Sequence, residues 1–379
     1  MDSAVRPSDD GRAWLEIDLD AIAYNAARIR SLLPGGCELM AVVKADAYGH
    51  GAVRVAERLR REGVSTFAVA SVVEGIQLRD NGIDGEILVL GYTHPKDAGF
   101  LHTHDLTQLV VDGEHAKALN AAGHKLRVHI AVDTGMHRLG VEPSNFEEIE
   151  NIYACKNLAV EGVATHLASS DSLDSGDVEF TKRQLESFFS VVDTLKGKGY
   201  SVGNLHVHAS YGVFNYPDTK CGYLRAGIAL YGVMSGDAAT VIAPELRPVL
   251  SLRAVIAQTR WIDAGESVSY GRIFTAGKRI KTATVCAGYG DGVPRNLSGH
   301  GFMCIVNGHK VPIIGRICMD MFVIDVTEAD RVAAGDVVTL IGRDGDEEVR
   351  CEDFAAAAGT ITNEILCRLG SRLPRVYVN

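Results

Sequence analysis

The stretch LMAVVKADAYGHGAVRVAERLRR, residues 39–61, decides the fold class. Its first five residues form a short apolar run, which is typical of a buried strand in a parallel sheet. Residues 51–61 then have the spacing of an amphipathic helix with one charged face. A buried strand followed by such a helix is the unit from which α/β folds are built.

The same alternation of apolar runs and helical patterns continues to about residue 245. The further strand candidates are residues 66–70, 86–90, 126–132, 158–165, 204–209 and 226–230. Strands that alternate with helices imply parallel βαβ units. About eight such units close a (β/α)8 TIM-like barrel, for which about 230 residues suffice. We therefore expect a barrel over residues 14–245.

The pattern changes after about residue 246. Residues 249–262 are rich in β-branched side chains, and Asn307-Gly308 lies between the apolar runs of residues 305–310, which predicts a hairpin. Residues 337–341 and 347–350 flank a second turn. We expect residues 246–379 to form a C-terminal, mainly β domain that ends in a short helical segment.

Composition and charge narrow the classes of function. A chain of 379 residues is long enough for two domains. Its formal charge of −10, with acids and bases interspersed, argues against nucleic acid as a partner, because such proteins carry basic patches. The eight cysteines form no CxxC pair and no zinc-ligand spacing, so we expect no metal and free thiols in a reducing cytosol.

The N-terminal residues 1–13 lack the apolar core of a signal peptide, and we expect them to form a flexible tail. The sequence contains no run of about 18 apolar residues that could span a membrane. We expect a soluble, cytoplasmic chain whose N-terminus is either this flexible tail or the place where a longer protein was cut.

Lys44 follows the first apolar run directly. At the carboxyl end of a barrel strand, a side chain points into the mouth where barrel enzymes carry out their chemistry. A lysine that is desolvated there can lose its proton and attack a carbonyl group to form a Schiff base. A lone lysine at the end of a strand is more often simply exposed to solvent. The surrounding motifs must therefore decide whether Lys44 is an exposed residue or a catalytic one.

The segment AVVKADAYGHG, residues 41–51, resembles the cofactor-binding signature of the alanine racemase family, in which this lysine carries pyridoxal phosphate. The resemblance runs from Trp14 to Arg375. Its further motifs, in the family's order, are DTGMHRLG (133–140), ATHLASSD (164–171), LRAGIALYG (224–232), VSYG (268–271), AGYGDGVPR (287–295) and GRICMD (315–320). Each motif alone is weak, but the combination is specific. It implies a fold-type III pyridoxal-phosphate enzyme that works as a homodimer.

The resemblance implies a set of cofactor-binding residues. Besides Lys44, these are Tyr48, Ser210, Gly227 and Ile228 at the phosphate, Arg138 at the phenolic oxygen, and Arg225 at the pyridine nitrogen, supported by His166 and His206. Arginine does not readily give up a proton, so it would leave the pyridine nitrogen unprotonated. The cofactor is then a weaker electron sink, and the short-lived carbanion has less time for transamination.

Racemisation needs one base on each face of the substrate Cα. The resemblance implies that Lys44 is one base and that the other is Tyr270, supplied by the partner subunit. In isolation, Tyr270 would be a packed strand residue. The remaining residues implied at the substrate are Arg138, Met319 and Asp320, with Tyr289, Asp171, Arg295 and Arg316 along the substrate channel.

Two positions depart from the family. Ala131 stands where the family often has a carboxylated lysine that orients the arginine matching Arg138. Asn363 stands where the family normally has a tyrosine, and its smaller amide would leave both room and a hydrogen-bond partner for a hydroxymethyl group. The second departure resembles the catalytic domain of the VanT-type membrane-bound serine/alanine racemases of vancomycin resistance. This resemblance implies that the chain is a soluble domain cut from a longer, membrane-anchored protein, with this domain on the cytoplasmic side.

We therefore expect a racemase for serine, alanine or both that supplies a D-amino acid for peptidoglycan precursors. An ordinary biosynthetic alanine racemase is the alternative. A fold-type III amino-acid decarboxylase is more remote, because such enzymes typically face the pyridine nitrogen with a carboxylate and use a triple-glycine phosphate loop. A non-catalytic pyridoxal-phosphate carrier would consist of the barrel alone, so the second domain and VSYG argue against it.

Overall fold

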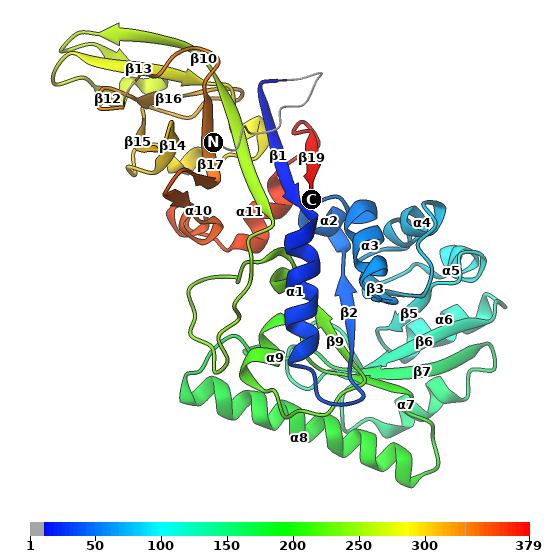
Figure 1. Cartoon of the computed structure of the whole chain (residues 1–379). Coiled ribbons are helices and arrows are strands. Elements are labelled where there is room, and N and C mark those ends of the chain that lie inside the picture. The colour runs from blue at the N-terminus through cyan, green and yellow to red at the C-terminus, as the bar shows by residue number, and fades with distance from the viewer. Residues whose placement is uncertain (1–10, 330) are drawn as a thin grey trace.

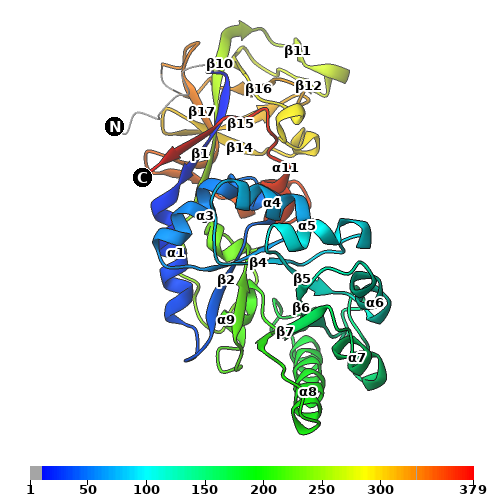
Figure 2. The same ribbon diagram turned by 90° about the vertical axis from the view of Figure 1, so that its right-hand side faces the viewer.

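The computed structural model describes residues 11–329 and 331–379. Most of the tail expected at residues 1–13 lies outside these ranges. The chain forms a parallel barrel with helices around it, followed by a mainly β domain, which confirms the predicted fold class (Figures 1 and 2).

The barrel is an eight-stranded parallel sheet whose strands follow one another in chain order. The strands are β2 Glu38–Val42, β3 Thr66–Val69, β4 Glu86–Val89, β5 Thr107–Val110, β6 Leu126–Ala131, β7 Leu158–Ala164, β8 Asn204–His206 and β9 Tyr223–Ala226. Strand β9 pairs with β2 in parallel. Backbone hydrogen bonds from Gly222 to Leu205 (2.7 Å) and from Arg225 to His208 (3.1 Å) join β9 to the β8 segment and close the barrel.

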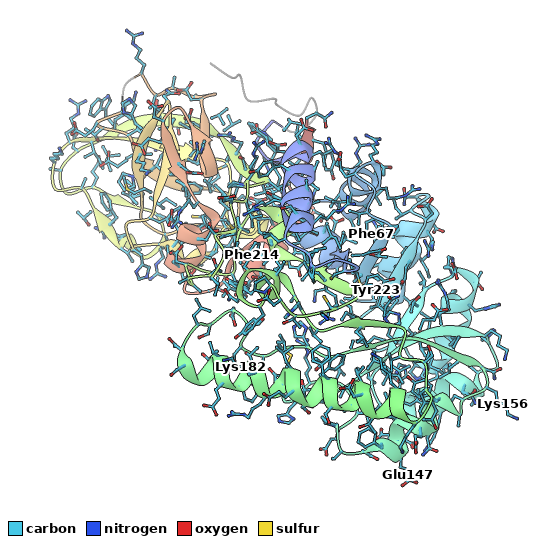
Figure 3. The ribbon with its side chains drawn as sticks, turned by 60° about the horizontal axis from the view of Figure 1, so that its bottom comes forward. Phe67, Glu147, Lys156, Lys182, Phe214 and Tyr223 are labelled. Carbon is cyan, nitrogen blue, oxygen red and sulfur yellow. The ribbon has the colours of Figure 1, made fainter. Side chains whose placement is uncertain are left out.

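Helices cover the outside of the barrel. They are α1 Leu19–Ser31, α3 Ala52–Arg61, α4 Val72–Asp80, α5 Ala98–Thr103, α6 Gly113–Ala121, α7 Phe146–Tyr153 and α8 Ser175–Gly197, with the short α2 Lys44–Tyr48, α9 Ser210–Asn215 and 3-10 helix η2 Ile228–Tyr231 near the mouth. Side-chain caps fix several starts, since Asp18, Ser71 and Asp112 each accept a hydrogen bond from a first-turn N–H. Figure 3 shows the exposed Glu147, Lys156 and Lys182 on the outer helices and loops.

Two barrel strands differ from the sequence prediction. Strand β5, with the sequence TQLV, was not predicted, because its two polar residues interrupt the apolar run that marks a buried strand. Gln108 is nevertheless fully buried, and its amide group donates to the carbonyl oxygens of Gly91 (2.7 Å) and Leu109 (2.6 Å). The strand predicted at residues 226–230 was wrong for most of its length. The strand ends at Ala226, and after Gly227 the chain forms η2.

The second domain is built on a nine-stranded sheet. Its order is β18-β17-β14-β15-β16-β13-β10-β1-β19, with β17 also paired to β10. The bounds are β1 Ala13–Asp18, β10 Leu250–Ile262, β13 Ile280–Val285, β14 Met303–Val306, β15 His309–Ile314, β16 Phe322–Asp325, β17 Val337–Asp344, β18 Glu347–Val349 and β19 Arg375–Val378. The hairpin predicted at Asn307-Gly308 is confirmed: it joins β14 to β15, with both turn residues at positive φ (50° and 75°).

Strand β1 belongs to this second sheet, although the sequence assigned residues from Trp14 onward to the barrel. It pairs antiparallel with β10 and parallel with the C-terminal strand β19, so both ends of the chain enter the same sheet. Asp18 ends β1 and caps α1, and the chain therefore passes directly from the sheet to the outside of the barrel (Figure 1).

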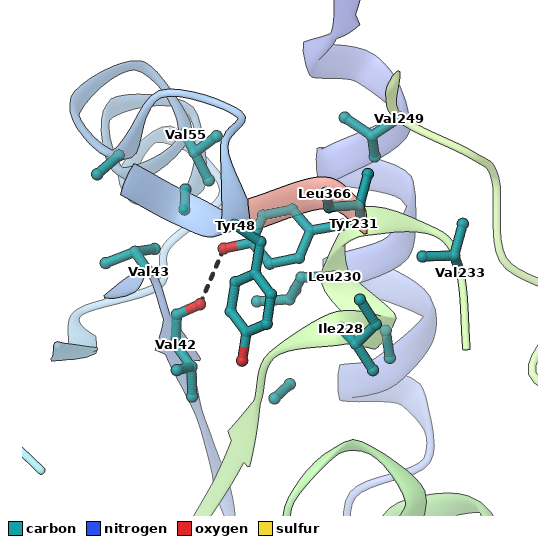
Figure 4. Close-up of a cluster of buried hydrophobic side chains, with 14 of the residues drawn as sticks. Val42, Val43, Tyr48, Val55, Ile228, Leu230, Tyr231, Val233, Val249 and Leu366 are labelled. Carbon is teal, nitrogen blue, oxygen red and sulfur yellow. Dashed lines mark hydrogen bonds between the residues drawn. The ribbon is translucent and has the colours of Figure 1, made fainter. Parts of the chain in front are cut away.

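Two short helices, α10 Cys351–Ala357 and α11 Thr362–Arg368, bring the second domain against the barrel mouth. Figure 4 shows the buried cluster at this junction, where Leu366 of α11 lies near Tyr48 and Tyr231. The Tyr231 hydroxyl donates to the carbonyl oxygen of Val42 (2.8 Å), and its ring centroid lies 4.9 Å from that of Tyr48. The β domain therefore supports the loop that carries Lys44.

Candidate active site

A cavity of about 450 Å³ opens at the carboxyl ends of the barrel strands. It brings together residues that are far apart in the sequence, from the ends of all eight barrel strands and from α11. The predicted site residues that line it are Lys44, Tyr48, Arg138, His166, His206, Ser210, Arg225, Gly227, Ile228 and Asn363, together with Ala131.

The backbone after β2 presents Lys44 to this cavity. Four consecutive residues, Ala45, Asp46, Ala47 and Tyr48, have φ between 53° and 54°, so they form a left-handed turn. Each non-glycine residue in this region costs about 1–2 kcal/mol. Such a conformation persists only where its surroundings hold it, and it is commonest at functional sites.

Three contacts hold the left-handed turn. The N–H of Ala45 donates to Glu74 Oε1 (2.8 Å), and Asp46 Oδ1 accepts from the N–H of Ala52 (2.8 Å). Nε of Arg375, in the C-terminal strand β19, donates to the carbonyl oxygen of Gly49 (3.0 Å). The turn is therefore locked partly from the barrel and partly from the second domain.

The cavity carries an excess of positive charge. Among the described residues that line it, Lys44, Arg138 and Arg225 are basic, while Asp133 is the one carboxylate. Burial and the nearby guanidinium group of Arg138 lower the pKa of Lys44 below its ordinary value of 10.5. The site therefore favours both an anionic ligand and a neutral, nucleophilic amine.

Arg225 is almost fully buried (5% exposed) and held by acceptors on both terminal nitrogens. Nη1 donates to Nδ1 and to the carbonyl oxygen of His206 (2.6 and 2.7 Å), and Nη2 donates to the carbonyl oxygen of Thr165 (2.7 Å). His166 Nδ1 lies 3.2 Å from Nη2, and burial lowers the pKa of His166 to about 3. Both histidines are therefore neutral acceptors. These contacts leave Nε of Arg225 as the donor without a partner among the described residues.

Hydroxyl groups and backbone N–H groups converge on the part of the cavity wall formed by Tyr48, Ser210 and the start of η2. Ser210 Oγ accepts from the N–H of Gly227 (3.0 Å) and of Ala229 (3.3 Å), at the start of η2. A Cβ atom at position 227 would lie 2.5 Å from the hydroxyl oxygen of Tyr48. Glycine is therefore required for this hydroxyl group to reach the wall.

Asn363 reaches the cavity from α11 and is fixed by Ser235, which the sequence analysis missed. Ser235 Oγ donates to Asn363 Oδ1 (2.8 Å), and the backbone N–H of Ser235 donates to the hydroxyl oxygen of Tyr211 (3.0 Å). The amide oxygen of Asn363 is thus occupied, and its Nδ2 group is left to donate. Ser235 lies just outside the motifs, so no local signal marks it.

Arg138 lacks the support that a carboxylated lysine would supply. Ala131 lines the cavity and is 5% exposed. Within residues 11–329 and 331–379, no hydrogen bond or ion pair holds the exposed Arg138 side chain.

The remaining predicted residues lie outside the cavity. Tyr270, Tyr289 and Met319 lie on the β domain with 69%, 43% and 52% of their surface exposed. Asp320 is paired with Arg372 (2.7 Å), and Arg316 lies beside Gly271. Asp171 is exposed after β7, and Arg295 begins a short 3-10 helix. One chain therefore assembles the residues implied for the cofactor but not those implied for the opposite face of the substrate.

Both domains match families of known proteins. The family described as alanine racemase, N-terminal domain, matches residues 17–235, and alanine racemase, C-terminal domain, matches residues 249–377. The chain belongs to the alanine racemase family. An alanine racemase of Geobacter sulfurreducens is 39% identical, with 96% of both chains covered.

A second relative is longer than this chain. An amino-acid racemase of Enterococcus faecalis is 40% identical over 98% of this chain, which spans about half (52%) of that relative's length. Among solved structures, the alanine racemase of Bartonella henselae with covalently bound pyridoxal phosphate matches with a TM-score of 0.85 and 31% identity, covering 97% of this chain and 100% of that one.

The described residues also bear on two other kinds of site, a membrane span and a metal centre. No helix there combines the length and apolar character that a membrane span requires. No group of three or more histidine, cysteine, aspartate or glutamate side chains there is arranged to hold a metal ion.

Proposed function

We propose that this chain is a pyridoxal-phosphate-dependent amino-acid racemase that interconverts the L and D isomers of alanine and serine. One observation carries the proposal: the cavity places Lys44, whose pKa is lowered, in the same site as Arg225, whose buried guanidinium group keeps one free donor. Family membership supports the same conclusion. The D-amino acid would supply peptidoglycan precursors, and its serine form would serve in vancomycin resistance.

The residues present fit pyridoxal phosphate. Tyr48, Ser210 and the start of η2 offer neutral donors on one wall, which suit a phosphate group. Arg225 lines the cavity, and its Nε, the donor without a partner among the described residues, suits a ring nitrogen, while Arg138 suits the phenolic oxygen. When bound, the cofactor acidifies the substrate Cα–H by delocalising the electron pair that is left behind.

Lys44 and Tyr270 are the two bases of the proposed reaction. The Lys44 amine, whose pKa is lowered by burial and by Arg138, takes or returns the proton on the face of Cα that belongs to the D isomer. Tyr270 of the partner subunit serves the L face. Its 69% exposure on the β domain, away from its own cavity, supports a role in a second copy of the chain. Met319, Asp320, Tyr289 and Arg316 lie on the same domain and would come with it, while Asp171 and Arg295 would line the channel.

Asn363 makes serine an accepted substrate in this proposal. Its Oδ1 is occupied by Ser235, so Nδ2 is the group that can donate to the hydroxyl oxygen of serine. The absence of a tyrosine ring at this position provides the room. A hydroxyl group that is buried without a partner costs about 1–3 kcal/mol, so this donor decides whether serine is tolerated.

An ordinary alanine racemase is the second candidate, and the Geobacter relative favours it, since it is an alanine racemase over nearly its full length. Incubation with L-alanine and with L-serine, followed by chiral separation, distinguishes the candidates. We expect D-alanine and D-serine at comparable rates. Formation of D-alanine alone would indicate an ordinary alanine racemase. Release of carbon dioxide would indicate a decarboxylase, and the absence of any reaction would indicate a non-catalytic carrier.

A further inference from the structure

A line of buried polar groups runs through the interior of the barrel, away from the cavity. Nη1 of Arg225 lies 2.6 Å from Nδ1 of His206, and Nε2 of His206 lies 2.9 Å from Nδ1 of His129. Nε2 of His129 lies 3.4 Å from Oε1 of Glu86, and neither of these two buried atoms makes a hydrogen bond with any described residue. Both histidines are fully buried (0% exposed), so they are shielded from water. The line therefore connects Arg225 to a carboxylate on another strand.

Glu86 lies at the amino-terminal end of the barrel, where it begins β4. Its Oε2 accepts a hydrogen bond from the Tyr223 hydroxyl (2.9 Å), and that hydroxyl accepts one from Asn204 Nδ2 (2.9 Å). Tyr223 begins β9 and is labelled in Figure 3. The Glu86 side chain is only 14% exposed, so this carboxylate is held mainly by protein groups.

The chemistry of the two ends gives the line a direction. Arginine has only donors, and an ionised carboxylate has only acceptors. His206 must therefore present an unprotonated Nδ1 to Arg225 and carry its proton on Nε2, from which it donates to His129. His129 in turn carries its proton on Nε2, facing Glu86. Burial lowers the pKa of His129 to about 3 and that of His206 well below 6.5, so both rings are neutral.

The line ends on a pure acceptor when Glu86 is ionised. The pKa of Glu86 is raised, chiefly by burial, while the Tyr223 hydroxyl and the charge of Arg127 act to lower it and so favour the anion.

We propose that Glu86 is a positioning residue for Arg225: as the acceptor that faces His129, it fixes, through His129 and His206, the hydrogen-bond direction that holds the guanidinium group and leaves its Nε free for the cavity. This inference rests on the proposed function, which assigns Nε to the ring nitrogen of the cofactor. In the reverse direction, a proton on Nδ1 of His206 would face a donor of Arg225, and the guanidinium group would have to turn.

The test compares the wild-type holoprotein with Glu86→Gln and with Glu161→Gln. Glu161 is a matched control, because it is a barrel carboxylate on β7, 43% exposed and 3.8 Å from Arg127, outside the line. Nitrogen-15 spectra of histidine-labelled protein report which ring nitrogen carries the proton, and His129→Gln assigns the His129 signal. Steady-state kinetics on L-alanine supply kcat and KM separately.

We expect both rings to be neutral with the proton on Nε2, and the Nε2 signal of His129 to move in Glu86→Gln only. We expect Glu86→Gln to lower kcat about tenfold with KM little changed, because the guanidinium group shifts but the substrate pocket does not. Tyr223→Phe, which removes one hydrogen bond to Glu86, should lower kcat about threefold and keeps the test open if Glu86→Gln does not fold.

Three outcomes of these experiments decide between the proposal and its alternatives. A proton on Nδ1 of either ring, or a cationic ring, overturns the proposal. Equal kinetics for Glu86→Gln and Glu161→Gln overturn it as well. If the wild-type spectra and their change in Glu86→Gln are as expected but no D isomer forms, the line of groups stands and the proposed racemase function fails.

Discussion

The barrel mouth and the exposed face of the β domain differ in how far one chain completes them. At the mouth, Arg225 is held by buried hydrogen bonds, and the turn after Lys44 is held by Glu74 and Arg375. On the β domain, Tyr270 is 69% exposed and does not line the cavity that contains Lys44. The difference teaches that one chain prepares the half of the site that we propose for the cofactor, and it fits our proposal that a second copy supplies the other half.

Loss of the anchor should have the largest effect. Lys44→Ala should abolish the visible absorbance of the bound cofactor and lower kcat by a factor of about 1,000 or more, because it removes both the covalent link and one base. Absorbance spectra and the chiral assay measure the two losses. Lys182→Ala on the outer face of α8 is the matched control and should behave as wild type. Retained absorbance in Lys44→Ala would mean that another lysine is the anchor.

The second prediction concerns the β-domain face. Tyr270→Ala should slow exchange of the L-isomer Cα proton with solvent by about 100-fold, while exchange from the D isomer continues through Lys44. Exchange in deuterated water, followed by NMR on each isomer, measures both rates. Trp261→Phe, at an exposed aromatic residue on β10 of the same domain, should change both rates little. An equal fall in both directions for Tyr270→Ala would give Tyr270 a structural part only.

The third prediction concerns the wall that α11 contributes to the mouth. Asn363→Tyr should lower kcat/KM for L-serine at least about tenfold and leave alanine intact or improved, because the ring removes both the space and the Nδ2 donor. Ser235→Ala, which frees the amide to rotate, should have a smaller effect of the same sign. Parallel kinetics on both substrates test this. If both substrates are lost equally, Asn363 acts on the cofactor phosphate instead.

The smallest effect concerns the charge around Lys44. Neutral lysine is the form that reacts with a carbonyl group, so reconstitution with the cofactor should speed up as pH rises through the pKa of Lys44, which lies below 10.5. Arg138→Gln removes a nearby cation that lowers this pKa, so the midpoint should move to higher pH by up to about one unit. Stopped-flow absorbance across pH gives the midpoint. A shift to lower pH would contradict this electrostatic account.

Sequence reasoning reached the fold class through patterns that depend on burial. The apolar run before Lys44 and the Asn307-Gly308 turn both have local signatures, and the structure confirms the barrel and the hairpin. The sequence did not predict strand β5, because Gln108 is buried with its amide group hydrogen-bonded, and no hydrophobic pattern reveals such a residue. It did not predict the pairing of β1 with β19 either, because this pairing joins the two ends of the chain.

At the site, motifs predicted which residues gather but not how they are held. The left-handed turn after Lys44 depends on Glu74 and on Arg375, which is more than 300 residues away in the sequence. Ser235 and the Glu86–His129 contact are likewise products of the tertiary fold. The exposed state of Tyr270 could not be inferred from VSYG either, because a strand tyrosine is more often packed.

Complementation between two inactive variants tests the shared site most directly. In a mixed dimer of Lys44→Ala and Tyr270→Ala, one site carries both substitutions and the other carries neither. Co-expression should therefore restore about a quarter of wild-type activity when the subunits pair at random, because half of the dimers are mixed and each has one intact site. Activity no higher than that of the two variants measured separately would contradict the account, and each chain would then have to complete its own site.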